Sequence, residues 1–368
     1  MMILLCLTLL STTLSQEEKI VKLPLMDSFD TYTIRLMPDS YPMKLILDLD
    51  FTIDYMWVFY NTYPIRSDKE TVELNKKIGN NSMAARTYDN FEVVHSNIKL
   101  NNFPIHVLDD SNDMDNYFDG FPLAYSFTDN NNSIIEYLYS REMIEHKGFG
   151  ISKVKGELPS YLFIGGFSDD VKKAFPYVSK CKIKNNQWGC QLDKVIINNH
   201  KEFYNTYDSV FQANHKEIYA PEEYNEYLYQ DIIRHYVENK TCSYNKNKEL
   251  YLCDCGIIYK FPTMHFIIEG INFTFVAREL FSNYNKQCEF NIVSNKKNAN
   301  QWELGTIFLR KYVTYFDYDH SEILFYTKKQ LIKQNKPIHS AVMFSCILFI
   351  IIGIIHLAYI RIIKVSTK

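Results

Sequence analysis

Glycine is scarce in this chain: there are 12 glycines among 368 residues, which is few for a fold that needs many tight turns. Charge of either sign is not in surplus, since 40 Lys and Arg residues against 43 Asp and Glu residues leave a formal net charge of −3. This balance gives no indication of a nucleic-acid partner. The chain also lacks a short internal repeat, which argues against a solenoid.

Apolar residues are plentiful, at 46% of the chain, and include 28 Tyr and 25 Phe, which favour strands. The length fits two packed lobes better than one average domain. Short alternating segments bounded by Asn, Asp, Gly and Pro predict strands at 44–53, 161–167, 194–199, 264–275 and 323–326. Helical patterns occur at 134–147 and 222–236. The sequence therefore predicts a mostly β fold with a few helices.

Both ends of the chain are apolar. Residues 1–15 have the pattern of a secretory signal peptide without its basic start, and a buried first strand is the alternative. Residues 341–363 form a nearly uncharged run, and about 20 apolar residues are enough for a helix to span a bilayer. Residues 328–340 are then a juxtamembrane spacer and 364–368 a cytoplasmic tail. We expect a single-pass type I membrane protein of the secretory pathway or cell surface.

The cysteine content agrees with that compartment. An even number in a secretory chain indicates disulfides, with several possible pairings. A Cys-Asp-Cys segment could be half of a zinc site, but no second cysteine pair or suitably spaced histidine completes it, so we expect no metal. Six cysteines lie between the apolar ends: Cys181, Cys190, Cys242, Cys253, Cys255 and Cys288. Glycosylation sequons occur at Asn80, Asn131, Asn239 and Asn272.

Several segments carry a family pattern in the same order along the chain. In the first half these are Asp50 ahead of Trp57-Val58, a flap-like segment at 78–83, and the segments 117–125 and 162–166. In the second half they are 188–195, 255–288, and Trp302 to Asp317, which includes Leu304-Gly305-Thr306-Ile307-Phe308. Together they span almost the whole lumenal body, and they resemble the pepsin-like aspartic proteases.

The resemblance implies a bilobal pepsin-like acid protease fold without a cofactor, with an N-terminal lobe at 16–175 and a C-terminal lobe at 176–327. It also implies an aspartic-type endopeptidase that binds an extended peptide in a cleft between the lobes. The stretch from Gln16 to the first expected strand is too short for the family's usual pro-segment. The resemblance pairs Cys255 with Cys288, and proximity then favours Cys181–Cys190 and Cys242–Cys253.

The family's mechanism requires two aspartates that share one proton. Asp50 occupies the first position, with Asp48 on the same face of the strand as the alternative. Gln212 occupies the second position, counted back from Pro221, and its carboxamide cannot exchange a proton near neutral pH or below. Asp208 is the obvious substitute if the second strand is misplaced.

Other positions depart from the family as well. His215 and Lys216, next to Gln212, could indicate a replacement chemistry, but a polar loop on the cleft floor is the simpler interpretation. Asp193 matches a position that is not catalytic in the family. Phe51-Thr52 replaces Thr-Gly, Ile78 replaces the flap tyrosine beside Gly79 and Ser82, and Phe121-Pro122-Leu123 replaces a glycine-containing segment.

We therefore expect a membrane-anchored, catalytically inactive homologue that binds an extended peptide or protein ligand in its cleft. An active aspartic endopeptidase with a divergent site is the first alternative. A structural surface glycoprotein whose cleft has closed is the second.

Overall fold

The computed structural model of the protein describes residues 19–27, 31–39, 44–51, 56–59, 63, 72–78, 81–108, 119–125, 133–152, 160–197, 201–284, 286–296, 298 and 300–331. The expected signal peptide at 1–15 and the apolar segment at 341–363 lie outside these residues. Within the described ranges, no helix is both long and apolar enough to cross a bilayer.

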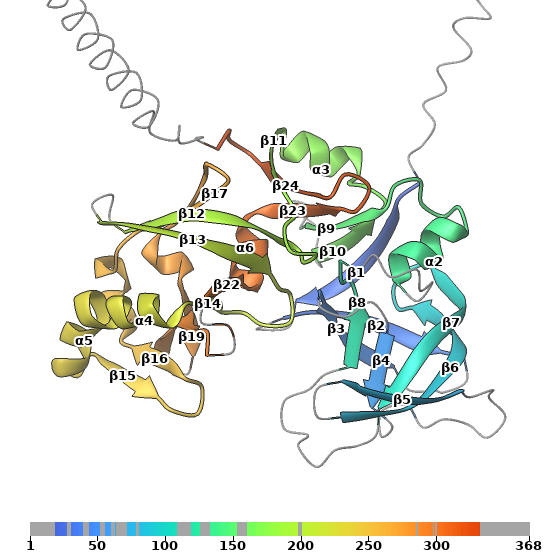
Figure 1. The fold of residues 1–368 in the computed structure, drawn as a ribbon, viewed down its shortest axis with the longest axis horizontal. Coiled ribbons are helices and arrows are strands. Elements are labelled where there is room, and N and C mark those ends of the chain that lie inside the picture. The colour runs from blue at the N-terminus through green and yellow to red at the C-terminus, as the bar shows by residue number, and fades with distance from the viewer. Residues whose placement is uncertain are drawn as a thin grey trace, which may run out of the picture.

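The largest of three sheets has 13 strands and joins the two halves of the chain. Strands β23 and β24, from the end of the chain, lie beside β9 and β10 from its first half (Figure 1). The strand order is β11-β24-β23-β9-β10-β1-β2-β3-β8-β4-β7-β6-β5. The bounds are β1 Val21–Asp27, β2 Tyr32–Pro38, β3 Leu45–Asp50, β4 Met56–Phe59, β5 Val72–Ile78, β6 Asn81–Val93, β7 Lys99–Leu108, β8 Asp119–Pro122, β9 Gly148–Ser152, β10 Ser160–Ile164, β11 Tyr177–Lys182, β23 Val313–Asp317 and β24 Glu322–Thr327.

Two smaller sheets are built from the second half of the chain alone. A seven-stranded sheet has the order β18-β17-β12-β13-β22-β14-β21, and a four-stranded sheet has the order β15-β16-β20-β19. The bounds are β12 Gly189–Ile197, β13 Lys201–Phe211, β14 Ile218–Ala220, β15 Cys242–Asn245, β16 Leu250–Cys253, β17 Met264–Ile268, β18 Ile271–Phe275, β19 Phe281–Tyr284, β20 Gln287–Phe290, β21 Ile292–Ser294 and β22 Gln301–Leu304.

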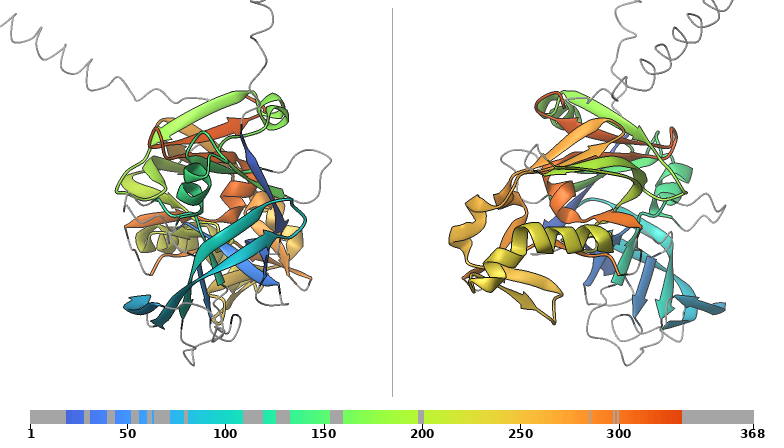
Figure 2. Two further views of the ribbon diagram at one scale, coloured as in Figure 1. Left: turned by 90° about the vertical axis from the view of Figure 1, so that its right-hand side faces the viewer. Right: turned by 60° about the vertical axis from the view of Figure 1, so that its left-hand side comes forward.

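The helices of the described residues are short. The segment expected at 222–236 forms α4 (Glu222–Leu228), a π-helical turn (Tyr229–Ile233) and α5 (Arg234–Glu238) in succession. This helix lies next to the small sheet at one end of the molecule (Figure 2). The others are α2 Ile134–Ser140, α3 Asp169–Ala174, α6 Thr306–Lys311 and the 3₁₀ turns Cys255–Lys260 and Ala277–Glu279.

The helix expected at 134–147 is shorter than the sequence indicates. It ends at Ser140 because Glu142 adopts a left-handed conformation, with φ of 55°, and the Glu142 N–H donates to the carbonyl of Tyr139. The turn lets Ile144 return to the core, where it is 2% exposed. Burial of that side chain therefore outweighs continuation of the helix.

Three disulfides stabilise the second half of the chain. They join Cys181 to Cys190, Cys242 to Cys253 and Cys255 to Cys288, with Cα–Cα distances of 6.1, 4.0 and 5.1 Å. These are the expected pairs. Cys242–Cys253 joins β15 to β16 within the four-stranded sheet, and Cys255–Cys288 joins the 3₁₀ turn that follows β16 to β20.

Candidate functional site

The first aspartate strand, β3, carries two buried carboxyl groups. Asp50 ends the strand opposite Pro122 of the parallel strand β8, and the Leu123 N–H donates to the Asp50 carbonyl oxygen at 2.8 Å. Asp48 lies on the same face of β3. Both carboxyl side chains are 7% exposed. Asp50 and Asp48 thus both remain candidates for the first aspartate.

Asp48 has unusual acid–base properties. Burial raises its pKa to about 6, and the charge of Asp50 adds to the rise, whereas a hydrogen bond from the hydroxyl of Thr31 opposes it. That hydroxyl donates to Asp48 Oδ1 at 3.0 Å. Asp48 therefore keeps a proton at mildly acidic pH, where an ordinary aspartate has lost it.

Trp57 packs directly against Gly120. A Cβ added at Gly120 would lie 2.1 Å from Trp57 Nε1, so no larger residue fits there. Leu123, where the family pattern has a glycine, is fully buried, and its carbonyl accepts a hydrogen bond from Trp188 Nε1 at 2.7 Å. The loop beside the first aspartate is therefore filled by side chains and tied to the second half of the chain.

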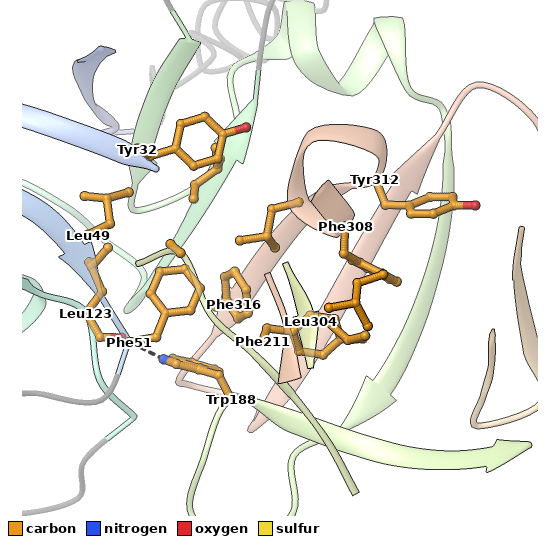
Figure 3. Packing of buried hydrophobic residues seen from close by; sticks show 14 of the residues in the cluster. Tyr32, Leu49, Phe51, Leu123, Trp188, Phe211, Leu304, Phe308, Tyr312 and Phe316 are labelled. Carbon is orange, nitrogen blue, oxygen red and sulfur yellow. Dashed lines mark hydrogen bonds between the residues drawn. The ribbon is translucent and has the colours of Figure 1, made fainter. Parts of the chain in front are cut away.

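Phe51, which the sequence aligns with the family's threonine, lies between the two halves of the chain. Its ring centroid is 5.2 Å from that of Phe149 and 4.9 Å from that of Phe316, both in edge-on geometry. The ring is 4% exposed, and Figure 3 shows it beside Phe316 and Trp188. The residue after the first aspartate thus belongs to an aromatic core that both halves share.

Gln212, which the sequence aligns with the second aspartate, lies directly after β13. Phe211 is paired with Leu304 of the parallel strand β22, and the Gln212 N–H donates to the Leu304 carbonyl at 3.0 Å. Phe211 and Leu304 are therefore neighbours, as the alignment requires. The side-chain oxygen Oε1 of Gln212 is buried and has no hydrogen-bond partner among the described residues.

The loop after Gln212 is held against the turn between β22 and α6. The N–H of Gly305 donates to the carbonyl of Glu217 at 3.1 Å, and the N–H of Thr306 donates to that of His215 at 2.9 Å. A Cβ at Gly305 would lie 2.2 Å from the Glu217 oxygen. Gly305 is required here because the two backbone segments approach so closely.

His215 directs an unpaired nitrogen toward a carboxylate. Its Nδ1 lies 3.1 Å from the Glu217 carbonyl oxygen, which can only accept, so Nδ1 carries the proton. Its Nε2 is buried without a hydrogen bond and lies 3.6 Å from Glu303 Oε2. A protonated ring would form an ion pair with Glu303.

A cavity of about 770 Å³ opens at this loop. Phe51 and Tyr125 from the first half line it together with Gln212 and His215 from the second half. Asp50 is not among its lining residues, and neither is Asp208, which accepts a hydrogen bond from the side chain of Asn185. Further lining residues include Asn214, Tyr219, Glu249, Lys296 and Glu303.

Several carboxylates lie near Tyr219, which lines the cavity. Burial raises its pKa to about 12, and the nearby carboxylates of Glu217, Glu303 and Glu249 add to the rise. Glu249 is paired with Lys296 at 2.6 Å. The cavity therefore offers hydrogen-bonding and charged groups from its second-half wall and aromatic surface from Phe51 and Tyr125.

The expected flap is a hairpin. Strands β5 and β6 pair antiparallel, with Ile78 opposite Asn81. Gly79 and Asn80 lie outside the described residues, and the structure describes no side chain at Ile78 or Ser82. Their roles in covering a ligand remain predictions.

A buried charge cluster next to the loop was missed by the sequence analysis. Lys216 is 6% exposed, and its ammonium group lies 2.9 Å from Glu289, which also accepts from Lys248. Burial raises the pKa of Glu289, but the hydrogen bonds and charges of Lys248 and Lys216 lower it to below its usual range. Lys216 therefore stabilises the loop through its ion pair with Glu289, and it does not line the cavity.

Other candidate residues have structural contacts or lie apart from the cavity. Asp193 accepts from the N–H of Gly270 at 2.6 Å and holds the β17–β18 turn. Asn239 is exposed after α5, whereas Asn272 is half-buried on β18, and Asn131 lies outside the described residues. Within the described part of the chain, no group of three His, Cys, Asp or Glu side chains could hold a metal ion.

The model of the protein family described as "Eukaryotic aspartyl protease" matches residues 86–327, more than half of the chain. The chain belongs to the eukaryotic aspartyl protease family. Its fold is similar to the crystal structure of the aspartic proteinase from Irpex lacteus, with a TM-score of 0.62 and 12% identity over 84% of this chain and 97% of that one. No curated protein matches the chain in sequence.

These findings confirm the mostly β, pepsin-like fold. Members of the eukaryotic aspartyl protease family bind peptide substrates in a cleft. The disulfides of this member are typical of a protein of the secretory pathway.

Proposed function

We propose that this protein is a membrane-anchored member of the eukaryotic aspartyl protease family that has lost aspartic protease activity and binds an extended peptide or protein segment. The observation that carries the proposal is Gln212, which the sequence aligns with the second aspartate and whose backbone N–H donates to the Leu304 carbonyl. A carboxamide cannot share a proton with Asp50, so water would not be activated there. The apolar run at 341–363 supports the anchor.

The cavity has groups that suit a peptide. Every peptide unit presents an N–H donor and a carbonyl acceptor. The unpaired Oε1 of Gln212 could accept from a peptide N–H, and the aromatic rings of Phe51 and Tyr125 could pack on its side chains. Binding of this kind requires no carboxylate pair, so it is compatible with the loss of catalysis.

A divergent active enzyme is the second candidate, and Asp48 is the observation in its favour. A carboxyl group with a pKa of about 6 next to a second carboxylate has the properties of an acid–base pair. Both groups stand on one strand, however, and neither lines the described cavity. We therefore favour the binding function.

A cleavage assay separates the two candidates. The purified full chain is incubated with a peptide library from about pH 3 to about pH 7, with and without a pepstatin-like inhibitor, beside Asp50→Ala and Asp48→Ala. We expect no inhibitor-sensitive cleavage, and no gain from Gln212→Asp because Phe51 and Ile78 still depart from the family. Inhibitor-sensitive cleavage that Asp50→Ala abolishes would establish the enzyme and refute the proposal.

The binding function is tested with the same library in the absence of turnover. Asn214 is exposed and lines the cavity, so Asn214→Trp should obstruct it and weaken peptide binding about tenfold or more. Lys260→Trp, at an exposed position away from the cavity, is the matched control. Equal binding by both variants would show that the peptide binds elsewhere.

A further inference from the structure

A second cavity, of about 640 Å³, shares no lining residue with the 770 Å³ cavity that Gln212 and Phe51 line. It lies where the ends of β2, β9 and β24 meet α6. Aromatic and aliphatic side chains form much of its surface, including Tyr32, Phe175, Leu309 and Tyr312. Tyr32 and Tyr312 project from β2 and from the end of α6 in Figure 3. The cavity is therefore large enough for an apolar chain and has the surface for it.

Positive charge gathers around this cavity. Arg310, Lys311, Lys328 and Lys329 line it, and no acidic residue does so among the described residues. Lys311 is neutralised by an ion pair with Glu279. The guanidinium of Arg310 lies 5.6 Å from the ring centre of Tyr32, a ring of the cavity wall.

The two lysines at the end of β24 add to this charge. The ammonium group of Lys328 lies 5.5 Å from the ring centre of Phe175, another ring of the wall. Lys328 and Lys329 are both exposed. The cations thus stand at the edge of an apolar cavity, where an anionic group could meet them without full loss of water.

A buried hydroxyl group in the wall is without a partner. Ser152 is 2% exposed and lines the cavity, and its Oγ has no hydrogen-bond partner within the described residues. Leaving a buried hydroxyl without a hydrogen bond is unfavourable. An oxygen acceptor from a bound ligand would remove this cost.

The neighbouring surface is apolar at an exposed sheet edge. Strand β11 is the edge strand, and its Tyr177 and Val178 are 45% and 49% exposed. They lie opposite Thr327 and Tyr326, which line the cavity. Exposed apolar residues beside a basic rim are typical of surfaces that meet lipids.

The position along the chain agrees with this interpretation. Leu331, the last described residue, also lines the cavity. The apolar run begins at Ala341, ten residues after Leu331. Ten residues span at most about 35 Å, so the start of the run lies within that distance of the cavity. If that run spans a bilayer, lipid headgroups come within reach of the cavity.

We propose that this cavity binds a phosphate-bearing amphiphile, with the phosphate at Lys328, Lys329 and Arg310 and the apolar chain against the aromatic wall. Ser152 would donate to an oxygen of the headgroup. The site is independent of the cleft, so it holds whether or not the cleft binds a peptide.

The test is a titration of the full chain, in a neutral detergent, with dihexanoyl phosphatidic acid, dihexanoyl phosphatidylcholine and inorganic phosphate, each followed by the shift in Tm. We expect phosphatidic acid to bind at least about tenfold more tightly than either of the others, because only it combines accessible negative charge with an apolar part. Added salt should weaken it.

Variants locate the site. Lys328→Gln with Lys329→Gln should weaken binding about tenfold, and Ser152→Ala about fivefold. Lys246→Gln with Lys260→Gln removes the same charge at exposed positions away from the cavity and should leave binding unchanged. Equal affinity for phosphatidylcholine, equal affinity for inorganic phosphate, or full binding by the Lys328–Lys329 variant would each overturn the proposal.

Discussion

The ionisation of Asp48 makes the stability of this protein depend on pH. Its pKa is about 6 in the folded protein and 3.8 as an ordinary aspartate, so the folded state holds the proton more tightly. Stability from this group is therefore fully present below about pH 4 and is lost as the pH rises through about 6. Asp48 opposes folding at neutral pH because its charge is then buried.

We predict that Asp48→Asn stabilises the protein at about pH 7.5, by about 1–2 kcal/mol, because the carboxamide stays neutral and can still accept from Thr31. At about pH 4 the gain should disappear. Urea unfolding of both proteins at the two pH values measures this. Asp39→Asn, at an exposed position near the end of β2, is the control. A gain of the same size at both pH values would refute this explanation.

At the scale of the element, the turn between β22 and α6 depends on one glycine. A Cβ at Gly305 would lie 2.2 Å from the backbone carbonyl oxygen of Glu217 and 2.7 Å from His215 Nδ1. Both atoms belong to the loop that follows Gln212. We predict that Gly305→Ala lowers the free energy of unfolding by about 1–3 kcal/mol, because the two segments must move apart.

Gly256→Ala is the matched control for this prediction. The nearest atom to its added Cβ is Asp254 Oδ1 at 3.4 Å, an ordinary contact. Urea unfolding compares the two variants, and peptide binding shows whether His215 has moved. A Gly305→Ala protein as stable as the control would mean that the loop yields easily and does not define the cleft floor.

The elements differ in how far the sequence could predict them. The position of Gln212, which directly follows β13, was assigned by counting back from Pro221 at the family's spacing. The end of α2 was missed because it depends on where Ile144 finds burial, which is a tertiary contact. The raised pKa of Asp48 could not be predicted either, since desolvation depends on everything packed around the strand.

Over the whole molecule, one aromatic core connects both halves of the chain, and Phe51 lies within it. Phe149 belongs to β9 and Phe316 to β23, and these two strands are paired in the 13-stranded sheet. The sequence indicated only that Phe51 is bulky for its position. Its contacts come from residues far apart along the chain, which no local pattern reveals.

We predict that Phe51→Thr, which restores the family's residue, destabilises the protein and does not activate it. Removing most of the ring leaves a cavity beside Phe149 and Phe316 and buries a hydroxyl, at a cost of about 3–5 kcal/mol. Because the ring contacts both halves, hydrogen exchange should quicken in β9 and β23 together. Tyr259→Thr, at a position 82% exposed, should change neither. A loss of protection in β9 alone would show that Phe51 stabilises one half only and does not hold the two together.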